Sequence, residues 1–125
     1  TLNRFDISNA VMTVTRFSGN PGQRHWEAVK QILGYVSYTR GTGIAFDGKL
    51  GKRLEAFADA DYASDLDQWS VSGGLICMGD VALSWFSRMQ KVVALSTTEA
   101  EYVTLSDTAK EVLFLRQFLE FINLE

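Results

Sequence analysis

The chain has 125 residues, a net charge of −3, one cysteine and one histidine. Apolar residues make up 46% and charged residues 22%, so we expect a globular chain with a packed core. The acidic balance argues against non-specific nucleic-acid binding by the whole surface and leaves only a local groove for such a role.

Single residues and short sequence patterns exclude several kinds of site and indicate the cellular compartment of the protein. Cys77 has no cysteine partner, and its apolar neighbours predict a small buried side chain rather than a reactive thiol. One cysteine and one histidine cannot make a Cys/His zinc site. No apolar run reaches the roughly 18 residues that a membrane-spanning helix needs. Without an initiator Met or a secretory signal pattern, we expect a piece of a longer intracellular protein.

Two helices are predicted at the start of the chain. The first covers 6–18, where Asp6 is a plausible N-cap and apolar residues recur at helical spacing. The second covers 21–40, with Asn20 as its cap and Pro21 at the favoured first position. His25 lies in its first turn, and we interpret it as an exposed or capping imidazole because no nearby residue suggests a catalytic triad.

From Gly43 onward the apolar period changes to two, which predicts strands. We expect turns at Asp47-Gly48 and Gly79-Asp80, and a bulge or close approach at Gly73-Gly74. An acidic loop at 62–68 and a basic connector at 87–91 separate the later elements. The predicted strands cover 44–46, 54–61, 69–78 and 81–86, and a short extended piece at 92–95 leads into a long helix at 96–124. Because strands and helices do not alternate, the order favours an α+β fold over a doubly wound parallel sheet.

The long helix begins with two glutamates that have different predicted roles. Ser96 and Glu99 match a capping box, in which Glu99 bonds back to the backbone of the cap. Glu101 lies about 200° away around the helix and heads an apolar stripe that runs through Leu105 to Ile122. A carboxylate near the core is costly unless it is paired, hydrogen-bonded or bound to metal. Glu101 is therefore either a functional residue or a partly exposed one, whereas Asp107 lies off the stripe and is predicted to be a solvated charge.

Asp59 and Asp61 close the strand predicted at 54–61 and share one of its faces. Asp is a poor strand former, so the pair either opens into the acidic loop or serves a site. The loop lacks the glycine and glutamate of an EF-hand. Carboxylates at a strand end that face a carboxylate in the first turn of a helix suit Mg²⁺, and two such ions can support phosphodiester cleavage.

Several long motifs resemble those of one family. Residues 57–67, Phe-Ala-Asp-Ala-Asp-Tyr-Ala-Ser-Asp-Leu-Asp, closely resemble the YxDADWAxDxD element of copia-type LTR retrotransposon polyproteins. Residues 84–102 resemble the family's SWxSxxQxxVALSSTEAEY. The upstream segments 4–7, 16–17, 20–21 and 25–28 resemble the end of the reverse transcriptase region and its connection. The family has Pro where Phe5 stands and usually Trp where Tyr62 stands, and the resemblance covers nearly the whole chain.

The resemblance implies an RNase H-like fold and Mg²⁺-dependent hydrolysis of the RNA strand of RNA–DNA hybrids. Asp59 and Glu101 match the family's first two catalytic, metal-binding carboxylates, and Asp61 is expected to support the strand end. Residues 1–42 would be thumb or connection helices of the reverse transcriptase, and 43–125 the N-terminal part of the RNase H domain. The family's third carboxylate lies in a later strand, so we expect this fragment to bind Mg²⁺ weakly and to be inactive alone.

The expected partners are an RNA–DNA hybrid and the rest of the Pol polyprotein, with no membrane. Arg88 and Lys91 could touch a phosphate backbone, or could lie in a solvated loop. Two other functions stay open: a degenerate or domesticated remnant that acts as a structural or binding module, and an acidic cation-binding domain without hydrolase activity. Partial exposure of the stripe from Leu105 to Ile122 would make the fragment poorly soluble.

Overall fold

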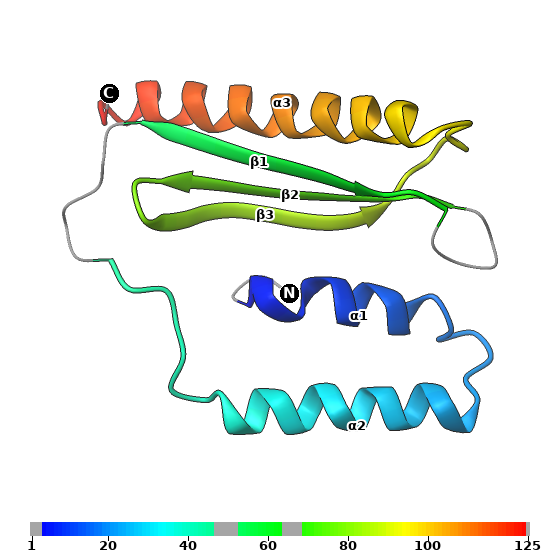
Figure 1. Cartoon of the computed structure of the whole chain (residues 1–125). Helices are drawn as coiled ribbons and strands as arrows, with labels where there is room; N and C mark the ends of the chain where they lie inside the picture. The colour runs from blue at the N-terminus through cyan, green and yellow to red at the C-terminus, as the bar shows by residue number, and fades with distance from the viewer. Residues whose placement is uncertain (1–3, 47–52, 64–68, 125) are drawn as a thin grey trace. The chain divides into compact units, whose positions relative to one another are not determined.

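A computed structural model of the chain describes residues 4–46, 53–63 and 69–124 (Figure 1). The chain divides into two compact units, residues 1–44 (unit 1) and residues 45–125 (unit 2). This division falls two residues after the boundary predicted at 42/43. In the part of the chain that the structure describes, no helix is long and apolar enough to cross a membrane.

Unit 1 contains a short 3-10 helix η1 (Phe5–Ile7), helix α1 (Ser8–Thr15) and helix α2 (Gln23–Tyr38). The first helix is shorter than predicted, and Asp6 does not cap it. The carboxylate of Asp6 instead accepts two hydrogen bonds from the guanidinium of Arg4, at 2.9 and 2.7 Å. The same guanidinium also donates to Thr39 Oγ1 just after α2, so this cluster joins the start of unit 1 to the end of α2.

Helix α2 begins two residues later than predicted, with Gly22 rather than Asn20 at the N-cap position. The reason is the imidazole of His25, whose Nδ1 accepts a hydrogen bond from the Gly22 backbone N–H at 2.8 Å. This bond gives one of the unpaired donors at the start of the helix a partner. The prediction of a capping histidine is therefore confirmed, and the prediction of Asn20 as the cap is wrong.

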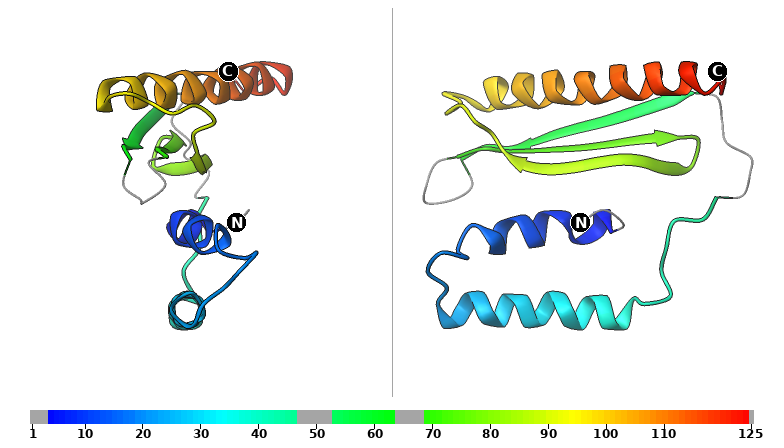
Figure 2. Two further views of the ribbon diagram at one scale, coloured as in Figure 1. Left: turned by 90° about the vertical axis from the view of Figure 1, so that its right-hand side faces the viewer. Right: turned by 180° about the vertical axis from the view of Figure 1, so that it is seen from behind.

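Unit 2 is an antiparallel sheet with one long helix on one of its faces (Figures 1 and 2). In the described residues the sheet order is β1-β2-β3, and α3 packs on β1 and β2. The elements are β1 (Leu54–Asp61), β2 (Val71–Met78), β3 (Val81–Met89) and α3 (Thr97–Phe121). The predicted α+β class with antiparallel strands and a final long helix is confirmed.

Three of the four predicted strands are present in the described residues, as β1 to β3, and some of their boundaries differ from the prediction. β1 has the predicted bounds, and Gly79, at φ 59°, forms the turn predicted between β2 and β3. β3 extends three residues further than predicted, so Ser87 to Met89 are strand rather than connector. The segment 44–46 is not a strand. The predicted turn at 47–48 and most of the acidic loop lie outside the described residues.

The two glycines of β2 allow a close approach but do not form a bulge. A side chain at Gly74 would collide with the ring of Phe86, which lies directly opposite on β3. The sheet irregularity lies elsewhere, between Ile76 and Cys77. Cys77 itself is half-buried with a free thiol, so it is less enclosed than predicted.

The core of unit 2 lies between α3 and the sheet. Its buried apolar residues include Ile76, Met78, Val81, Ala100 and Leu119. The helix turns Ala100, Thr104, Thr108 and Leu119 inward. Thr108 and Leu119 belong to the predicted stripe, whereas Ala100 and Thr104 do not. The prediction that Glu101 and Leu105 face the core is therefore wrong: Glu101 is exposed and Leu105 is 56% exposed. The small side chains of Ala100 and Thr104 favour this orientation by letting the helix lie close to β2.

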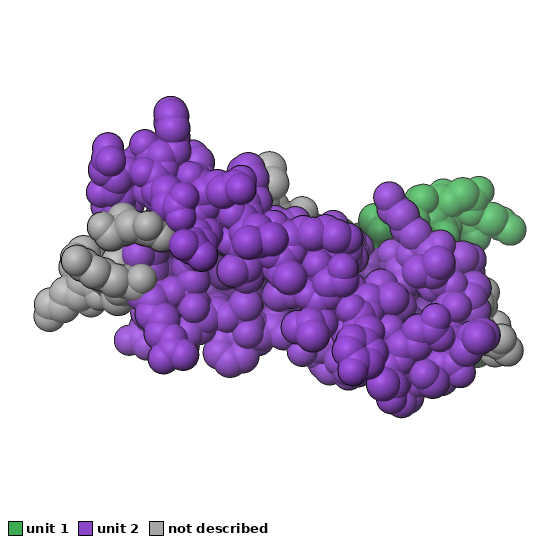
Figure 3. Space-filling view, turned by 90° about the horizontal axis from the view of Figure 1, so that it is seen from above, with its two compact units in different colours: residues 1–44 green, residues 45–125 purple. Residues whose placement is uncertain are grey.

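Much of the rest of α3 is apolar and exposed. Figure 3 looks onto the α3 side of unit 2, where side chains project from the surface. The exposed apolar residues of the helix include Leu105, Leu113, Phe114, Phe118 and Phe121. The predicted partial exposure of the stripe is thus confirmed at Leu105 and at Ile122, which is 39% exposed, but not at Leu119.

Candidate functional site

The first turns of α3 and the end of β1 enclose a pocket of about 410 Å³. Its lining residues are Ala58 from β1 and Thr97, Thr98, Glu101, Tyr102 and Leu105 from α3. Glu101 is the acidic residue in this lining, and its carboxylate forms no hydrogen bond or ion pair within the described residues. The pocket therefore combines one free negative charge with hydroxyl groups and apolar side chains.

Glu99 is already used for the structure of the helix. Its backbone N–H donates to the Ser96 hydroxyl at 3.1 Å, and its Oε2 accepts from the backbone N–H of Leu95 at 2.7 Å. The reciprocal capping predicted from the sequence is present, although the return bond goes to Leu95 rather than to Ser96. Of the two glutamates at the start of α3, only Glu101 is available for another role.

Asp59 lies next to this pocket in sequence but not on the same face of the sheet. Side chains alternate along a strand, and Ala58 lines the Glu101 pocket, so Asp59 and Asp61 belong to the face away from α3. The register agrees, because Ala60 is opposite Ser72, whose hydroxyl bonds to Thr104 of α3. The structure therefore brings Glu101 together with Ala58 and does not bring it together with Asp59 in one pocket.

We tested whether these residues fit a magnesium ion. Carboxylate oxygens are the right kind of ligand for this hard cation. The described residues, however, contain no group of three or more His, Cys, Asp or Glu side chains that could hold a metal. A single carboxylate in the pocket does not make a magnesium site, so the arrangement does not fit the ion as it stands.

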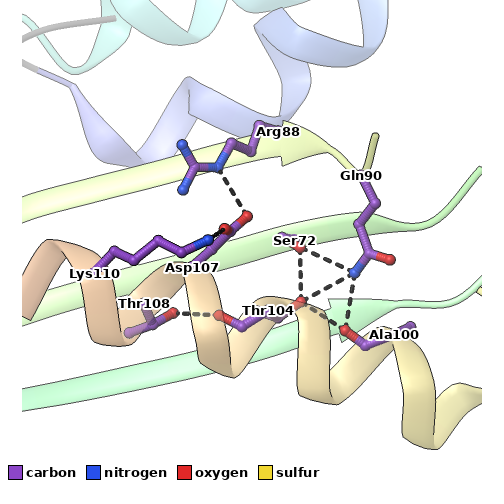
Figure 4. A network of polar contacts seen from close by, with 8 residues as sticks. All are labelled: Ser72, Arg88, Gln90, Ala100, Thr104, Asp107, Thr108 and Lys110. Carbon is purple, nitrogen blue, oxygen red and sulfur yellow. Dashed lines mark hydrogen bonds and ion pairs between the residues drawn. The ribbon is translucent and has the colours of Figure 1, made fainter. Parts of the chain in front are cut away.

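A buried polar network holds the start of α3 on the sheet (Figure 4). The Ser72 and Thr104 hydroxyls lie 2.7 Å apart, and the Thr104 hydroxyl donates to the Ala100 carbonyl at 3.0 Å. The side-chain nitrogen of Gln90 donates to Ser72, Thr104 and the Ala100 carbonyl, at 3.0, 3.2 and 2.9 Å. Gln90 is only 4% exposed, and its side-chain oxygen has no partner among the described residues.

This network was not predicted from the sequence. Gln90 lies in the segment 87–91, which was predicted as a connector, and a polar residue in such a segment is not expected to be buried. The only available signal was the Ala100–Thr104–Thr108 spacing, which places small residues four apart on one face of the helix. Because Ala100 precedes Glu101 directly, the network also sets the position of the Glu101 backbone.

Arg88 is engaged with α3 rather than lying in a solvated loop. It belongs to β3, its guanidinium lies 4.3 Å from the centre of the Phe86 ring, and its Nε is 3.5 Å from the Asp107 carboxylate. Asp107 also pairs with Lys110 at 3.1 Å and is half-buried, so its prediction as a solvated charge is wrong. Lys91 follows β3 and is exposed.

Unit 1 has a separate pocket of about 520 Å³ between the end of α1 and the start of α2. Val14, Phe17, Pro21, Trp26 and Val29 give it a mainly apolar lining. His25 also lines it and stacks on Phe17, with ring centres 4.2 Å apart. This pocket could not be predicted from local sequence patterns, because its walls come from two helices.

Comparisons with known proteins show that the chain is similar to part of retrovirus-related Pol polyproteins. The retrovirus-related Pol polyprotein from transposon TNT 1-94 of Nicotiana tabacum is 47% identical over 122 residues, which is 97% of this chain and 9% of that protein. The corresponding polyprotein from transposon RE1 of Arabidopsis thaliana is 37% identical over 93% of this chain. Secreted RxLR effector protein 161 of Plasmopara viticola is 36% identical over 90% of this chain and 80% of that protein. The chain is similar to a segment that retrovirus-related Pol polyproteins share with this effector protein.

The share of each relative that the chain covers differs strongly. The chain spans 9% and 8% of the two transposon polyproteins, but most of the effector protein. No family model matches the chain, and no solved structure matches it. The resemblance to Pol polyproteins inferred from the motifs is thus confirmed.

Proposed function

We propose that this chain is the part of Pol that joins the end of the reverse transcriptase region to the first half of an RNase H-like domain. In the parent protein, Asp59 and Glu101 would be catalytic carboxylates for hydrolysis of RNA in RNA–DNA hybrids. The observation that carries this proposal is the free carboxylate of Glu101 beside the end of β1, while Glu99 is used as a cap. Mg²⁺ would supply charge stabilisation for phosphodiester cleavage when bound in the parent.

We further propose that the isolated chain does not hydrolyse hybrids. Glu101 lines the pocket without Asp59, and the described residues hold no group of three potential ligands. A carboxylate of α3 and a carboxylate of β1 that points to the other face of the sheet would hold Mg²⁺ weakly at best. Inside a cell the expected partners remain the hybrid and the rest of Pol. Lys91 is the more available of the two predicted phosphate contacts, because Arg88 pairs with Asp107.

A cleavage assay with a labelled RNA–DNA hybrid and Mg²⁺ tests the second proposal. We expect the chain, Asp59→Asn and Glu101→Gln all to give only the background rate of a protein-free sample. Robust cleavage by the unchanged chain that disappears in Asp59→Asn would show that the site is complete and would overturn the proposal.

A magnesium titration followed by NMR tests the catalytic assignment independently of activity. We expect weak, saturable amide shifts near each of the two carboxylates. Glu101→Gln should remove the shifts near Glu101 and Asp59→Asn those near Asp59, whereas Glu111→Gln, the same charge change further along α3, should leave both in place. Shifts confined to other acidic residues, or none at all, would contradict the assignment of these two carboxylates.

A second candidate function is a non-enzymatic binding module. It is favoured by one specific observation: the match covers 80% of a relative named a secreted effector, so a region of this span occurs outside a polyprotein. A module of this kind needs a binding surface but no metal site. A chain that gives no magnesium-dependent shifts at Asp59 and Glu101 and still binds a macromolecular partner would favour this candidate over the first.

A further inference from the structure

The imidazole of His25 connects two parts of unit 1. Its Nδ1 accepts a hydrogen bond from the Gly22 backbone N–H at 2.8 Å, at the start of α2. Its ring also stacks on the ring of Phe17, with ring centres 4.2 Å apart and an angle of 7° between the planes. His25 thus contacts a residue near each end of the segment that connects α1 to α2. We call Phe17, Gly22 and His25 the His25 clamp.

The hydrogen bond to Gly22 requires a neutral imidazole in one tautomer. A neutral imidazole has one nitrogen that donates and one that accepts. Because Nδ1 accepts from Gly22, the proton of the neutral ring is on Nε2. In a protonated ring both nitrogens are donors. Nδ1–H and the Gly22 N–H would then face each other across 2.8 Å, so the bond would be replaced by repulsion.

The surroundings of His25 within unit 1 offer little compensation for a positive charge. Helix α1 has no charged side chain, and Asp6 of η1 pairs with Arg4. The charged residues of the connecting segment and of residues 23–30 of α2 are Arg16, Arg24, Glu27 and Lys30. Glu27 already accepts a hydrogen bond from Gln23 at 3.2 Å. His25 is also the third residue of α2, and the N-terminus of a helix disfavours a cation.

The stack on Phe17 opposes this effect but does not remove it. An aromatic ring attracts a cation placed over its face, so a protonated imidazole would still be drawn to Phe17. The same imidazole has no acceptor for Gly22, whatever its position over Phe17. The Gly22 N–H is one of the donors at the start of the helix that need a partner. Protonation therefore acts on the Gly22 end of the clamp.

We propose that His25 is a pH-dependent clamp, which holds Gly22 at the start of α2 when the imidazole is neutral and releases it when the imidazole is protonated. Histidine changes its charge between about pH 5 and pH 8, and His25 is the single histidine of the sequence. The clamp stabilises the start of α2 above this range, and its contribution is lost as the pH falls through it. The clamp residues also line the unit 1 pocket of about 520 Å³, so the clamp holds part of the wall of this pocket in place.

NMR of the full chain labelled with ¹⁵N tests the clamp between about pH 8 and pH 5. At the upper pH we expect the imidazole nitrogen shifts of a neutral ring with its proton on Nε2. At the lower pH we expect a protonated ring and greater mobility of the Gly19, Asn20 and Gly22 amides, measured as heteronuclear Overhauser effects. The Arg4–Asp6 pair does not contribute to this change, because the pKa of Asp6 is about 2 and its carboxylate stays ionised.

Two variants separate the clamp from a general effect of acid. Glutamine at the third position of a helix can also accept from the N-cap backbone, and it does not titrate. His25→Gln should therefore keep the three amides equally ordered at both pH values. Gln23→Ala, in the same turn, is the matched control and should respond to acid like the unchanged chain, because the Gln23 side chain bonds to Glu27 rather than to Gly22.

Three results would each overturn the proposal. The first is a neutral ring with its proton on Nδ1 at the upper pH. The second is an unchanged mobility of the three amides when the ring becomes protonated, and the third is an equal change of mobility in His25→Gln. None of these measurements uses magnesium or a nucleic acid, so the clamp goes beyond the proposed function and is tested independently of it.

Discussion

The surface ion pair of Arg4 and Asp6 is connected to the rest of unit 1 because Arg4 also donates a hydrogen bond to Thr39. The hydrogen bonds from Arg4 lower the pKa of Asp6 from 3.8 to about 2. Since this pKa is lower in the folded chain, the pair stabilises unit 1 above about pH 4, and the contribution is lost as the pH falls toward 2. We predict that Asp6→Asn reduces the melting temperature of unit 1 at pH 6 and has little effect near pH 2.

Glu27→Gln, another acidic-to-amide change in unit 1, is the matched control for this measurement. It lacks the Arg4 contacts and should show no comparable loss at pH 6. The same fall in melting temperature for Asp6→Asn at both pH values would contradict the role of the ionised carboxylate.

Gln90 is the residue with the largest predicted effect on stability. Its side-chain nitrogen donates to three buried acceptors, and a hydrogen bond of this kind contributes about 0.5–1.5 kcal/mol net. We predict that Gln90→Met, which keeps the volume, lowers the free energy of unfolding of unit 2 by about 2–3 kcal/mol. Denaturant unfolding followed by circular dichroism measures this.

Gln117→Met makes the same replacement at an exposed position of α3 and should change the stability of unit 2 very little. If both variants lose equal stability, the network of Gln90, Ser72 and Thr104 does not hold the helix on the sheet.

Single residues were predictable where a local rule defines their partner. The capping roles of Glu99 and His25 depend on neighbours three or four positions away, so the sequence contains them. The partners of Gln90 and Arg88 come from distant segments, and no local pattern shows them. Glu101 was assigned to the wrong face of α3 because apolar spacing alone did not reveal that small polar residues form the buried side.

Among the elements, β2 depends on a glycine for its packing against β3. A methyl group at Gly74 would collide with the Phe86 ring across the strand pair. We predict that Gly74→Ala destabilises unit 2 by about 1–3 kcal/mol, the usual cost of overpacking a core, and that thermal unfolding will show it.

The neighbouring Gly73 provides the control, because a methyl group there would meet only the Asp59 carbonyl at an ordinary contact distance of 3.7 Å. Gly73→Ala should therefore cost much less than Gly74→Ala. Adding Phe86→Leu to Gly74→Ala should recover part of the lost stability, and a failure to do so would point to a backbone effect rather than the ring.

Element type was more predictable than element boundary. The period of two and the Gly-Asp turn defined β1, the end of β2 and the start of β3 correctly, whereas β2 begins at Val71 rather than at Trp69. The end of β3 was predicted too early because Ser87 to Met89 are not apolar in pattern, while their backbone continues the ladder with β2. The segment 44–46 has a strand-like sequence, yet in the described residues it has no strand partner, and a strand requires one.

At the scale of the whole molecule, the two units differ in how they are stabilised. Unit 1 is stabilised by the packing of two helices and by hydrogen bonds at their ends, whereas unit 2 has a core between a helix and a sheet. In unit 2, α3 is apolar on more than one side, although the sheet covers only one. In the described part of unit 2 the sheet leaves Leu113, Phe114 and Phe118 of this helix exposed.

In the described residues β1 pairs with β2 alone and exposes three carboxylates, Glu55, Asp59 and Asp61, which affect how the chain responds to ionic strength. Paired strands lie about 4.8 Å apart, and repulsion between charges acts over about 10 Å at 0.1 M salt but only about 3 Å at 1 M. Concentrated salt should thus remove the barrier between two β1 edges, and light scattering should rise between 0.1 and 1 M sodium chloride. Asp59→Lys, which makes opposite charges available to an approaching β1 edge, should scatter more already at 0.1 M. Scattering that falls with added salt would show that the edge charges do not keep the chains apart.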